Sequence, residues 1–293
     1  MDVNFYTPLQ ASQQYSASFE AYKANSEENQ NISRWISEQF DDISRSLCKQ
    51  FEGVSTLSIL GIGSGDGTFE VEIVIQLLKT FPSVACTVVE PSGERIESYK
   101  QLVEKRKSAL HGATFEWRAE SLDEFYEVNR VNKRQFHFLS LIHSCYFMKH
   151  QELENHLRQI TGFLYAGGQA LIMHDAETTL MIQFQKRFTS NLHPLRPTIH
   201  GGHIKDALKN LQIEYEASII PILCDATKCS DEDSVEGNLL LDFLFAVEGC
   251  RANGKSEILK MIFEFMNNSD VSFNENGKLY VRMPTQVIVI SVT

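Results

Sequence analysis

The residues most able to do chemistry are a glycine-rich loop and an acidic residue that follows it. The loop, Gly61-Ile-Gly63-Ser-Gly65-Asp-Gly67, joins a short apolar run over 55–60 to an amphipathic segment over 69–79. Glycine lets backbone approach a ligand closely, and the first turn of a helix presents N–H groups to an anion. Glu90 ends the next apolar run, where a carboxylate would meet the hydroxyls of a ribose. The pattern predicts a nucleoside cofactor that carries an anionic group.

The spacing of the glycines distinguishes between two such cofactors, a dinucleotide and S-adenosylmethionine. A dinucleotide site has the pattern G-x-G-x-x-G, but its third glycine would fall on Asp66 or, counted from Gly63, on Thr68. An acidic side chain inside the turn would also oppose a pyrophosphate. S-adenosylmethionine carries only an α-carboxylate with an ammonium and a sulfonium, so we expect this cofactor and its product S-adenosylhomocysteine. In the remaining alternative, the glycines only make a tight strand-to-helix turn.

The elements around the loop alternate in type along the chain. Short apolar runs read as strands and longer amphipathic segments as helices, which predicts a mainly parallel sheet with helices on both faces. We therefore expect an α/β fold with a Rossmann-like seven-stranded sheet. The expected strands are 55–60, 85–90, 114–118, 136–148 with its following loop, 168–173 and 213–222, and the expected helices are 11–50, 69–79, 93–106, 152–163, 238–247 and 256–266.

Two segments depart from this alternation. Residues 277–292 read as two strands joined around Pro284, which predicts an antiparallel C-terminal hairpin at the sheet edge. Residues 175–210, with a loop over 199–203, look like an insertion. We expect a single domain over 1–293 with a smaller substrate-covering subdomain, or cap, built from 1–45 and about 176–250.

Composition restricts the partners. Acidic residues number 38 against 27 basic ones, which argues against nucleic acid and favours a cationic small molecule. The first residues lack the features of a signal peptide, and no apolar run is long enough to span a membrane. We therefore expect a cytoplasmic protein with no membrane partner. The six cysteines are scattered and expected to be reduced, and no complete metal-ligand spacing is present, so no metal is expected.

Several motifs together resemble one family over nearly the whole chain, the histamine N-methyltransferases. The matching segments include Tyr15-x-x-x-Phe19, Asn25-Ser-Glu-Glu28, Val88-Val-Glu90-Pro-Ser92 and Leu239-Leu-x-Asp-Phe243-Leu. The resemblance implies a class I S-adenosylmethionine-dependent N-methyltransferase that acts as a monomer on a small amine.

The resemblance also implies roles for single residues. Glu28 matches a carboxylate that grips the substrate's amine, and aromatic walls of the substrate site fall on Tyr15, Phe19, Phe147 and Phe243. The cofactor positions fall on Gly61, Glu90, Arg95, Ile142 and Ser121 (or its neighbour Leu122), to which the loop itself adds Gly63 and Gly65.

Five positions depart from the family pattern. His143 replaces a glutamine, Met283 an asparagine and Phe147 a tyrosine, while Leu9 replaces an aromatic residue and Gln183 a tryptophan. A site that loses a polar contact discriminates against its former ligand. We therefore expect histamine or another biogenic amine as the substrate. One alternative is a carboxylate-bearing imidazole such as histidine or carnosine, with Arg282 and His143 facing its anionic end, and another is a non-catalytic relative. His143 could act as a base, because its reference pKa is near neutral, or only line the pocket.

Overall fold

The computed structural model describes residues 14–188, 198–253 and 256–292, with the side chains of Phe147 and Ser256 left out. The chain divides into two compact units. Unit 1 takes its residues from Met1–Asn31, Asp175–His200 and Ile219–Thr285, and unit 2 from Ile32–His174, Gly201–Ser218 and Gln286–Thr293.

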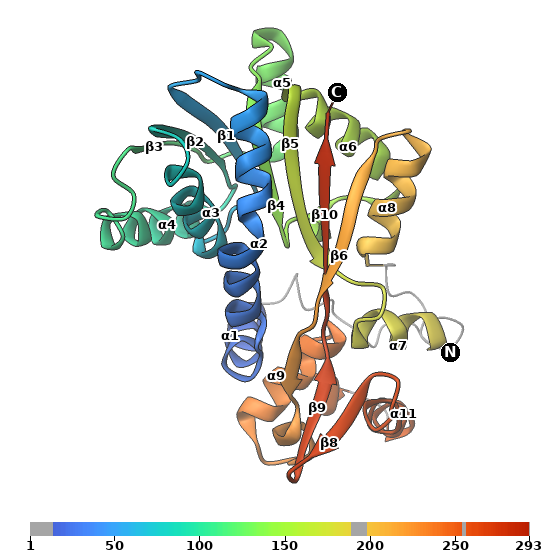
Figure 1. The fold of residues 1–293 in the computed structure, drawn as a ribbon. Coiled ribbons are helices and arrows are strands. Elements are labelled where there is room, and N and C mark those ends of the chain that lie inside the picture. Colours follow the sequence, from blue (N-terminus) through green and yellow to red (C-terminus); the bar gives the residue numbers. More distant parts are fainter. Residues whose placement is uncertain (1–13, 189–197, 254–255, 293) are drawn as a thin grey trace. The chain divides into compact units, whose positions relative to one another are not determined.

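Unit 2 contains the predicted seven-stranded sheet, in the order β3-β2-β1-β4-β5-β10-β6 (Figure 1). The strands β1 to β5 pair in parallel. Strand β10 runs against β5, because the N–H of Gly167 donates to the carbonyl of Val292 and the N–H of Val292 donates to Gly168. The mixed sheet confirms the expected fold class. The bounds are β1 Thr56–Ile62, β2 Ser83–Val89, β3 Ala113–Arg118, β4 Phe136–Ile142, β5 Leu164–Asp175, β6 Tyr215–Ile220 and β10 Thr285–Ser291.

Strands β1 and β4 are neighbours in the sheet, although β2 and β3 lie between them in the sequence. The strand order therefore reverses between β1 and β4. In sheets of this kind, the carboxyl ends of the strands at such a reversal form the ligand-binding edge. The glycine loop follows β1 at that edge, and His143 follows β4. The sheet order therefore places both at the same edge of unit 2.

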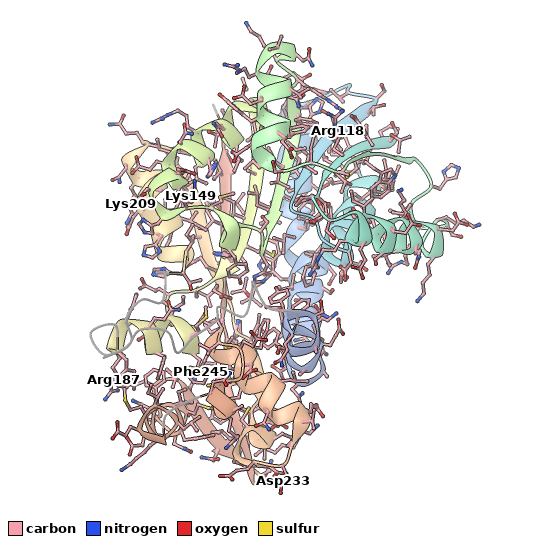
Figure 2. All side chains as sticks on the ribbon, turned by 180° about the vertical axis from the view of Figure 1, so that it is seen from behind. Arg118, Lys149, Arg187, Lys209, Asp233 and Phe245 are labelled. Carbon is pink, nitrogen blue, oxygen red and sulfur yellow. The ribbon has the colours of Figure 1, made fainter. Side chains whose placement is uncertain are left out.

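Amphipathic helices flank this sheet. In α2, the side chains of Ile32, Ile36, Phe40 and Leu47 are fully buried at helical spacing. Among the charged side chains, those of Lys149 and Lys209 (Figure 2) are more than half exposed. The helices with residues in unit 2 are α2 Glu28–Gln50, α3 Thr68–Leu78, α4 Gly93–Lys105, α5 Leu122–Asn132, α6 Leu153–Gly162 and α8 Gly201–Asn210, with the short turns η2 Cys145–Phe147 and η3 His150–Glu152.

Unit 1 is mainly helical, with a small antiparallel sheet in the order β7-β9-β8. Helix α1 packs against α9, and the ring of Phe184 on α7 meets that of Phe245 on α9 at 4.8 Å. The elements are α1 Tyr15–Asn25, the start of α2, α7 Leu180–Phe188, β7 Leu223–Asp225, η4 Thr227–Ser230, α9 Val235–Phe245, α10 Cys250–Asn253, α11 Ser256–Met266, β8 Ser272–Glu275 and β9 Lys278–Arg282.

The C-terminal antiparallel hairpin is present, but it is formed by β8 and β9. Its turn contains Asn276 and Gly277, which both have positive φ. The expected pairing of the strands on either side of Pro284 was wrong, because β10 enters the large sheet between β5 and β6. Strand β10 is buried along almost its whole length, which suits an interior strand better than an edge.

Three local boundaries also differ from expectation. The helix expected over 11–50 is interrupted: α1 ends at Asn25 and α2 begins at Glu28, whose N–H donates to the hydroxyl of Ser26 at 3.1 Å. The loop expected over 199–203 ends where α8 begins at Gly201, and α5 was not predicted. Among the described residues, no helix is long and apolar enough to cross a membrane.

Candidate functional site

The glycine loop is shaped largely by contacts with the protein itself. A Cβ on Gly61 would lie 1.9 Å from Oε1 of Glu70, and one on Gly67 would lie 2.2 Å from the ring of Tyr99. A Cβ on Gly63 would lie 2.5 Å from Cβ of Ser144. Gly65 is different: its φ is +58°, but the nearest atom to its Cβ position is Nη1 of Arg95 at 3.5 Å. Packing thus explains three of these glycines, and backbone conformation explains Gly65.

The loop also presents donors for a ligand. The N–H of Gly65 donates to Oε2 of Glu90 at 2.9 Å. Oδ1 of Asp66 accepts from both the N–H and the hydroxyl of Thr68, so this acidic residue closes the turn. Within the described part of the chain, the N–H groups of Ser64 and Asp66 donate to no protein atom. Two such N–H groups at the positive end of α3 fit the carboxylate of S-adenosylmethionine.

Glu90 is fixed beside this loop at the end of β2. Its side chain is 6% exposed, and its second oxygen, Oε1, accepts the N–H of Ser92 at 2.9 Å. Each carboxylate oxygen has a further lone pair that can accept from a hydroxyl. The structure therefore brings Glu90, Gly65 and Arg95 together, and the carboxylate suits the predicted contact with a ribose.

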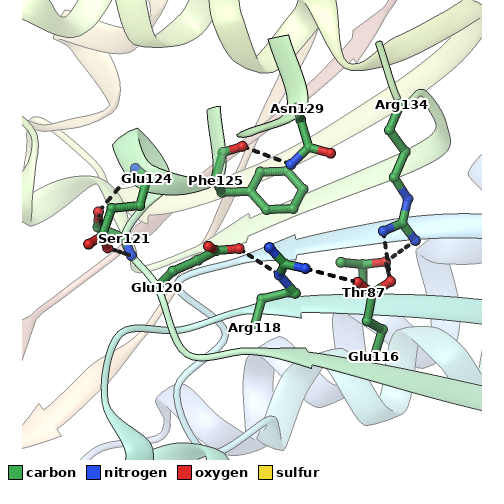
Figure 3. A network of polar contacts seen from close by, with 9 residues as sticks. All are labelled: Thr87, Glu116, Arg118, Glu120, Ser121, Glu124, Phe125, Asn129 and Arg134. Atoms are coloured by element: carbon green, nitrogen blue, oxygen red, sulfur yellow. Dashed lines mark hydrogen bonds and ion pairs between the residues drawn. The ribbon is translucent and has the colours of Figure 1, made fainter. Parts of the chain in front are cut away.

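Ser121 has a structural role that the sequence analysis did not anticipate. It begins α5 with a capping box: its hydroxyl accepts the N–H of Glu124 at 3.3 Å, and its own N–H donates to Oε2 of Glu124 at 2.7 Å (Figure 3). In the same view, Arg118 at the end of β3 pairs with Glu120 at 2.6 Å. Ile142 is the last residue of β4 and pairs with Met173. Their cofactor contacts remain predictions.

A buried carboxylate beneath the loop was missed. Glu70 on α3 is 5% exposed and accepts hydrogen bonds from the hydroxyls of Ser140 and Tyr99. Burial raises its pKa, and these hydrogen bonds oppose the rise. Its position against Gly61 makes it a support for the loop. The available signal was its place on the apolar face of the helix, one turn before Ile73 and Val74.

His143 is held where β4 ends. Its φ of +50° lies in the left-handed region, which costs a non-glycine residue about 1–2 kcal/mol. Its Nδ1 lies 2.9 Å from the hydroxyl of Tyr146, and the ring of Tyr146 lies 4.1 Å from that of His174. Strain of this kind is concentrated at functional sites. The three side chains form a polar aromatic cluster at the carboxyl ends of β4 and β5.

The predicted amine anchor lies in unit 1 with most of its predicted aromatic neighbours. Glu28 is 9% exposed, and its Oε1 accepts from the hydroxyl of Tyr22 at 3.2 Å. The ring centroid of Phe243 lies 4.4 Å from that of Tyr22 and 5.7 Å from that of Phe19, which in turn stacks with Tyr15 at 6.1 Å. Burial raises the pKa of Glu28 to about 7, while the hydrogen bond from Tyr22 acts to lower it. A carboxylate beside aromatic rings suits an ammonium group.

Three further predicted positions have different outcomes. The side chain of Phe147 lies outside the described atoms. Met283 is buried, and its N–H donates to the carbonyl of Ile222 at 2.9 Å. Arg282 donates to the carbonyls of Ser269 and Ser272, and its guanidinium lies over the ring of Phe273. Among the described residues, no group of three or more His, Cys, Asp or Glu side chains is placed to hold a metal.

Comparison with known proteins finds relatives over nearly the whole chain. The chain is 28% identical to the histamine N-methyltransferase of Xenopus tropicalis, over 99% of both chains. This chain is a homologue of the histamine N-methyltransferases. It is also 24% identical to carnosine N-methyltransferase 2 of Gallus gallus, over 91% of this chain and 83% of that protein. This chain is accordingly a methyltransferase, as the resemblance predicted.

The fold comparison is consistent with the sheet. The YcgJ protein of Bacillus subtilis superposes with a TM-score of 0.50 and 14% identity, covering 85% of this chain and 98% of that one. At this identity the similarity concerns the fold alone. No family model matches the chain.

Proposed function

We propose that the protein transfers a methyl group from S-adenosylmethionine to a nitrogen of a small amine. The observation that carries the substrate class is Glu28, a buried carboxylate with aromatic rings beside it. An ammonium group would supply a charge opposite to that of the carboxylate, and the rings of Phe19 and Phe243 would pack on its organic part.

The proposed cofactor site uses the residues that precede α3. The N–H groups of Ser64 and Asp66 would bind the carboxylate of S-adenosylmethionine, and Glu90 would accept from its ribose. Gly61, Gly63 and Gly65 form the backbone turn, and Arg95, Ser121 and Ile142 complete the proposed set. When bound, this cofactor supplies an electrophilic methyl group and leaves as S-adenosylhomocysteine.

The protein's part in the reaction is to orient the acceptor nitrogen and exclude water. The acceptor must offer a lone pair, and its proton must leave. We propose that His143 takes this proton, with its ring oriented by the hydrogen bond to Tyr146. Phe147 and Met283 belong to the proposed substrate wall, in place of the polar residues of the family.

One observation favours the alternative substrate and another opposes it. The similarity to a carnosine N-methyltransferase favours an acceptor that carries a carboxylate. Such an acceptor needs a cationic partner, but Arg282 is engaged with the carbonyls of Ser269 and Ser272. We therefore place an amine without a carboxylate first. We further propose that the protein acts on a small molecule as a cytoplasmic monomer, without metal, nucleic acid or membrane. Its substrate cap would be built from 1–45 and about 176–250.

The test is methyl transfer from labelled S-adenosylmethionine to a panel of acceptors. The panel contains histamine, histidine, carnosine and several aryl- and alkylamines, with Glu28→Gln assayed beside the wild type. We expect turnover of an amine without a carboxylate and a loss of at least about 100-fold in kcat/KM in Glu28→Gln, because the charged partner is removed. Preference for histidine or carnosine would replace the first substrate class with the second. Binding of S-adenosylhomocysteine by a wild type inactive on every acceptor would contradict the proposed function.

A further inference from the structure

Tyr22 is held in position through both its ring and its hydroxyl. Its side chain is 3% exposed on α1, and its ring lies on that of Phe243 with the planes 19° apart. Its hydroxyl donates to Oε1 of Glu28 at 3.2 Å. The stacking fixes the ring plane, so the hydroxyl has a defined direction toward the carboxylate.

The backbone around Glu28 is also fixed by hydrogen bonds. The N–H of Glu28 donates to the hydroxyl of Ser26, and the N–H of Glu27 donates to the carbonyl of Leu223 at 3.0 Å. Ser26 itself forms a bridge with Cys224 of β7. These contacts set where α2 begins, whereas a glutamate side chain has three further torsions whose ordering costs entropy. The hydrogen bond from Tyr22 restricts those torsions.

We propose that Tyr22 is a positioning residue for substrate recognition: its hydroxyl holds the Glu28 carboxylate in the orientation that binds an ammonium group. This inference rests on the proposed function of Glu28. It assigns a role to the hydroxyl itself, because stacking on Phe243 would need only the ring.

The charges around this pair fit the role. Burial, and then the charge of Glu28, raise the pKa of Tyr22 well above its ordinary value, so its hydroxyl remains a donor at neutral pH. The thiol of Cys224 on β7 and the carboxylate of Asp175 at the end of β5 also face Tyr22 and act in the same direction. Burial raises the pKa of Cys224, so this thiol is neutral. Tyr22 is thus a neutral donor to Glu28.

The variant Tyr22→Phe removes the hydroxyl and keeps the ring. In steady-state kinetics between pH 6 and 9, we expect KM for the amine at pH 7 to rise about three- to tenfold, with kcat within about twofold, because one hydrogen bond to a charged group is lost. The rise of KM toward low pH should begin at a higher pH, since the lost bond favoured the ionised carboxylate. Affinity for S-adenosylhomocysteine should not change. Tyr165→Phe, which removes an exposed hydroxyl in unit 2, is the matched control and should behave as wild type.

A second readout does not need turnover. Carboxyl NMR of the protein labelled at glutamate, with Glu28 assigned by its absence in Glu28→Gln, should show titration near pH 7 in the wild type and at higher pH in Tyr22→Phe. An unchanged titration, or equal losses in kcat and in cofactor affinity, would overturn the inference. If the Glu28 titration shifts but the protein is inactive on every amine, the coupling of Tyr22 to Glu28 is supported and only the proposed function is contradicted.

Discussion

Replacing Glu28 by glutamine should stabilise the free protein while removing its activity. Burial raises the pKa of Glu28 from its ordinary 4.5 to about 7. Folding therefore favours the protonated acid, and the native state binds more protons than the unfolded state between these two pH values. The free energy of unfolding must fall as the pH rises through this window. Glutamine has no such titration and can still accept from Tyr22.

The size of the effect follows from the shift. A difference of about 2.5 units, at 1.36 kcal/mol per unit, amounts to about 3 kcal/mol above pH 7. Below pH 4.5 the ionisation contributes nothing, because both states carry the protonated acid. Urea denaturation of wild type and Glu28→Gln at matched pH values from 4.5 to 8.5 isolates Glu28, because the groups whose pKa its charge raises, Tyr22 and Cys224, ionise above this range.

The expected result is a difference in unfolding free energy that grows with pH and levels off above pH 7. A difference that is constant with pH would refute the reasoning, because the carboxylate would then ionise without penalty. With bound amine, the wild type should become the more stable of the two proteins, since the amine stabilises only the wild type. Restoration of wild-type stability by the substrate, without effect on the variant, would tie the penalty to recognition.

The other predictions concern the cofactor site and the base. Gly67→Ala should lower the free energy of unfolding by more than about 2 kcal/mol, because of positive φ and the contact with Tyr99, whereas Gly93→Ala, with open space at its Cβ, should change it by less than about 1 kcal/mol in the same urea assay. Glu90→Gln should weaken S-adenosylhomocysteine at least about tenfold in calorimetry; equal affinity would remove it from the site. His143→Gln should lower kcat by about 100-fold or more; if only KM changes, His143 lines the pocket without acting as a base.

The sequence by itself determined the features that depend on nearby residues. The apolar run before Gly61, the turn and the following helix are local, and Glu90 comes one strand later, so the spacing predicted a carboxylate at the end of the next strand. The hydrogen bond that the N–H of Gly65 donates to Glu90 was not predicted. The chain-wide alternation of strands and helices predicted the seven-stranded sheet. Periodicity suffices here because consecutive parallel strands joined by helices usually lie near one another.

Only the tertiary structure decided which distant groups meet. Strand β10 lies between β5 and β6, where its apolar side chains are buried. No local sequence pattern distinguishes that position from a pairing of β10 with β9. The cap that Ser121 forms on α5 is instead a local feature that was missed, because Ser121 and Glu124 have the spacing of a capping box. The bond between Tyr22 and Glu28 spans the break between α1 and α2. Such partners depend on how helices are packed and on which charges are buried together, and neither is encoded in the spacing of residues along the chain.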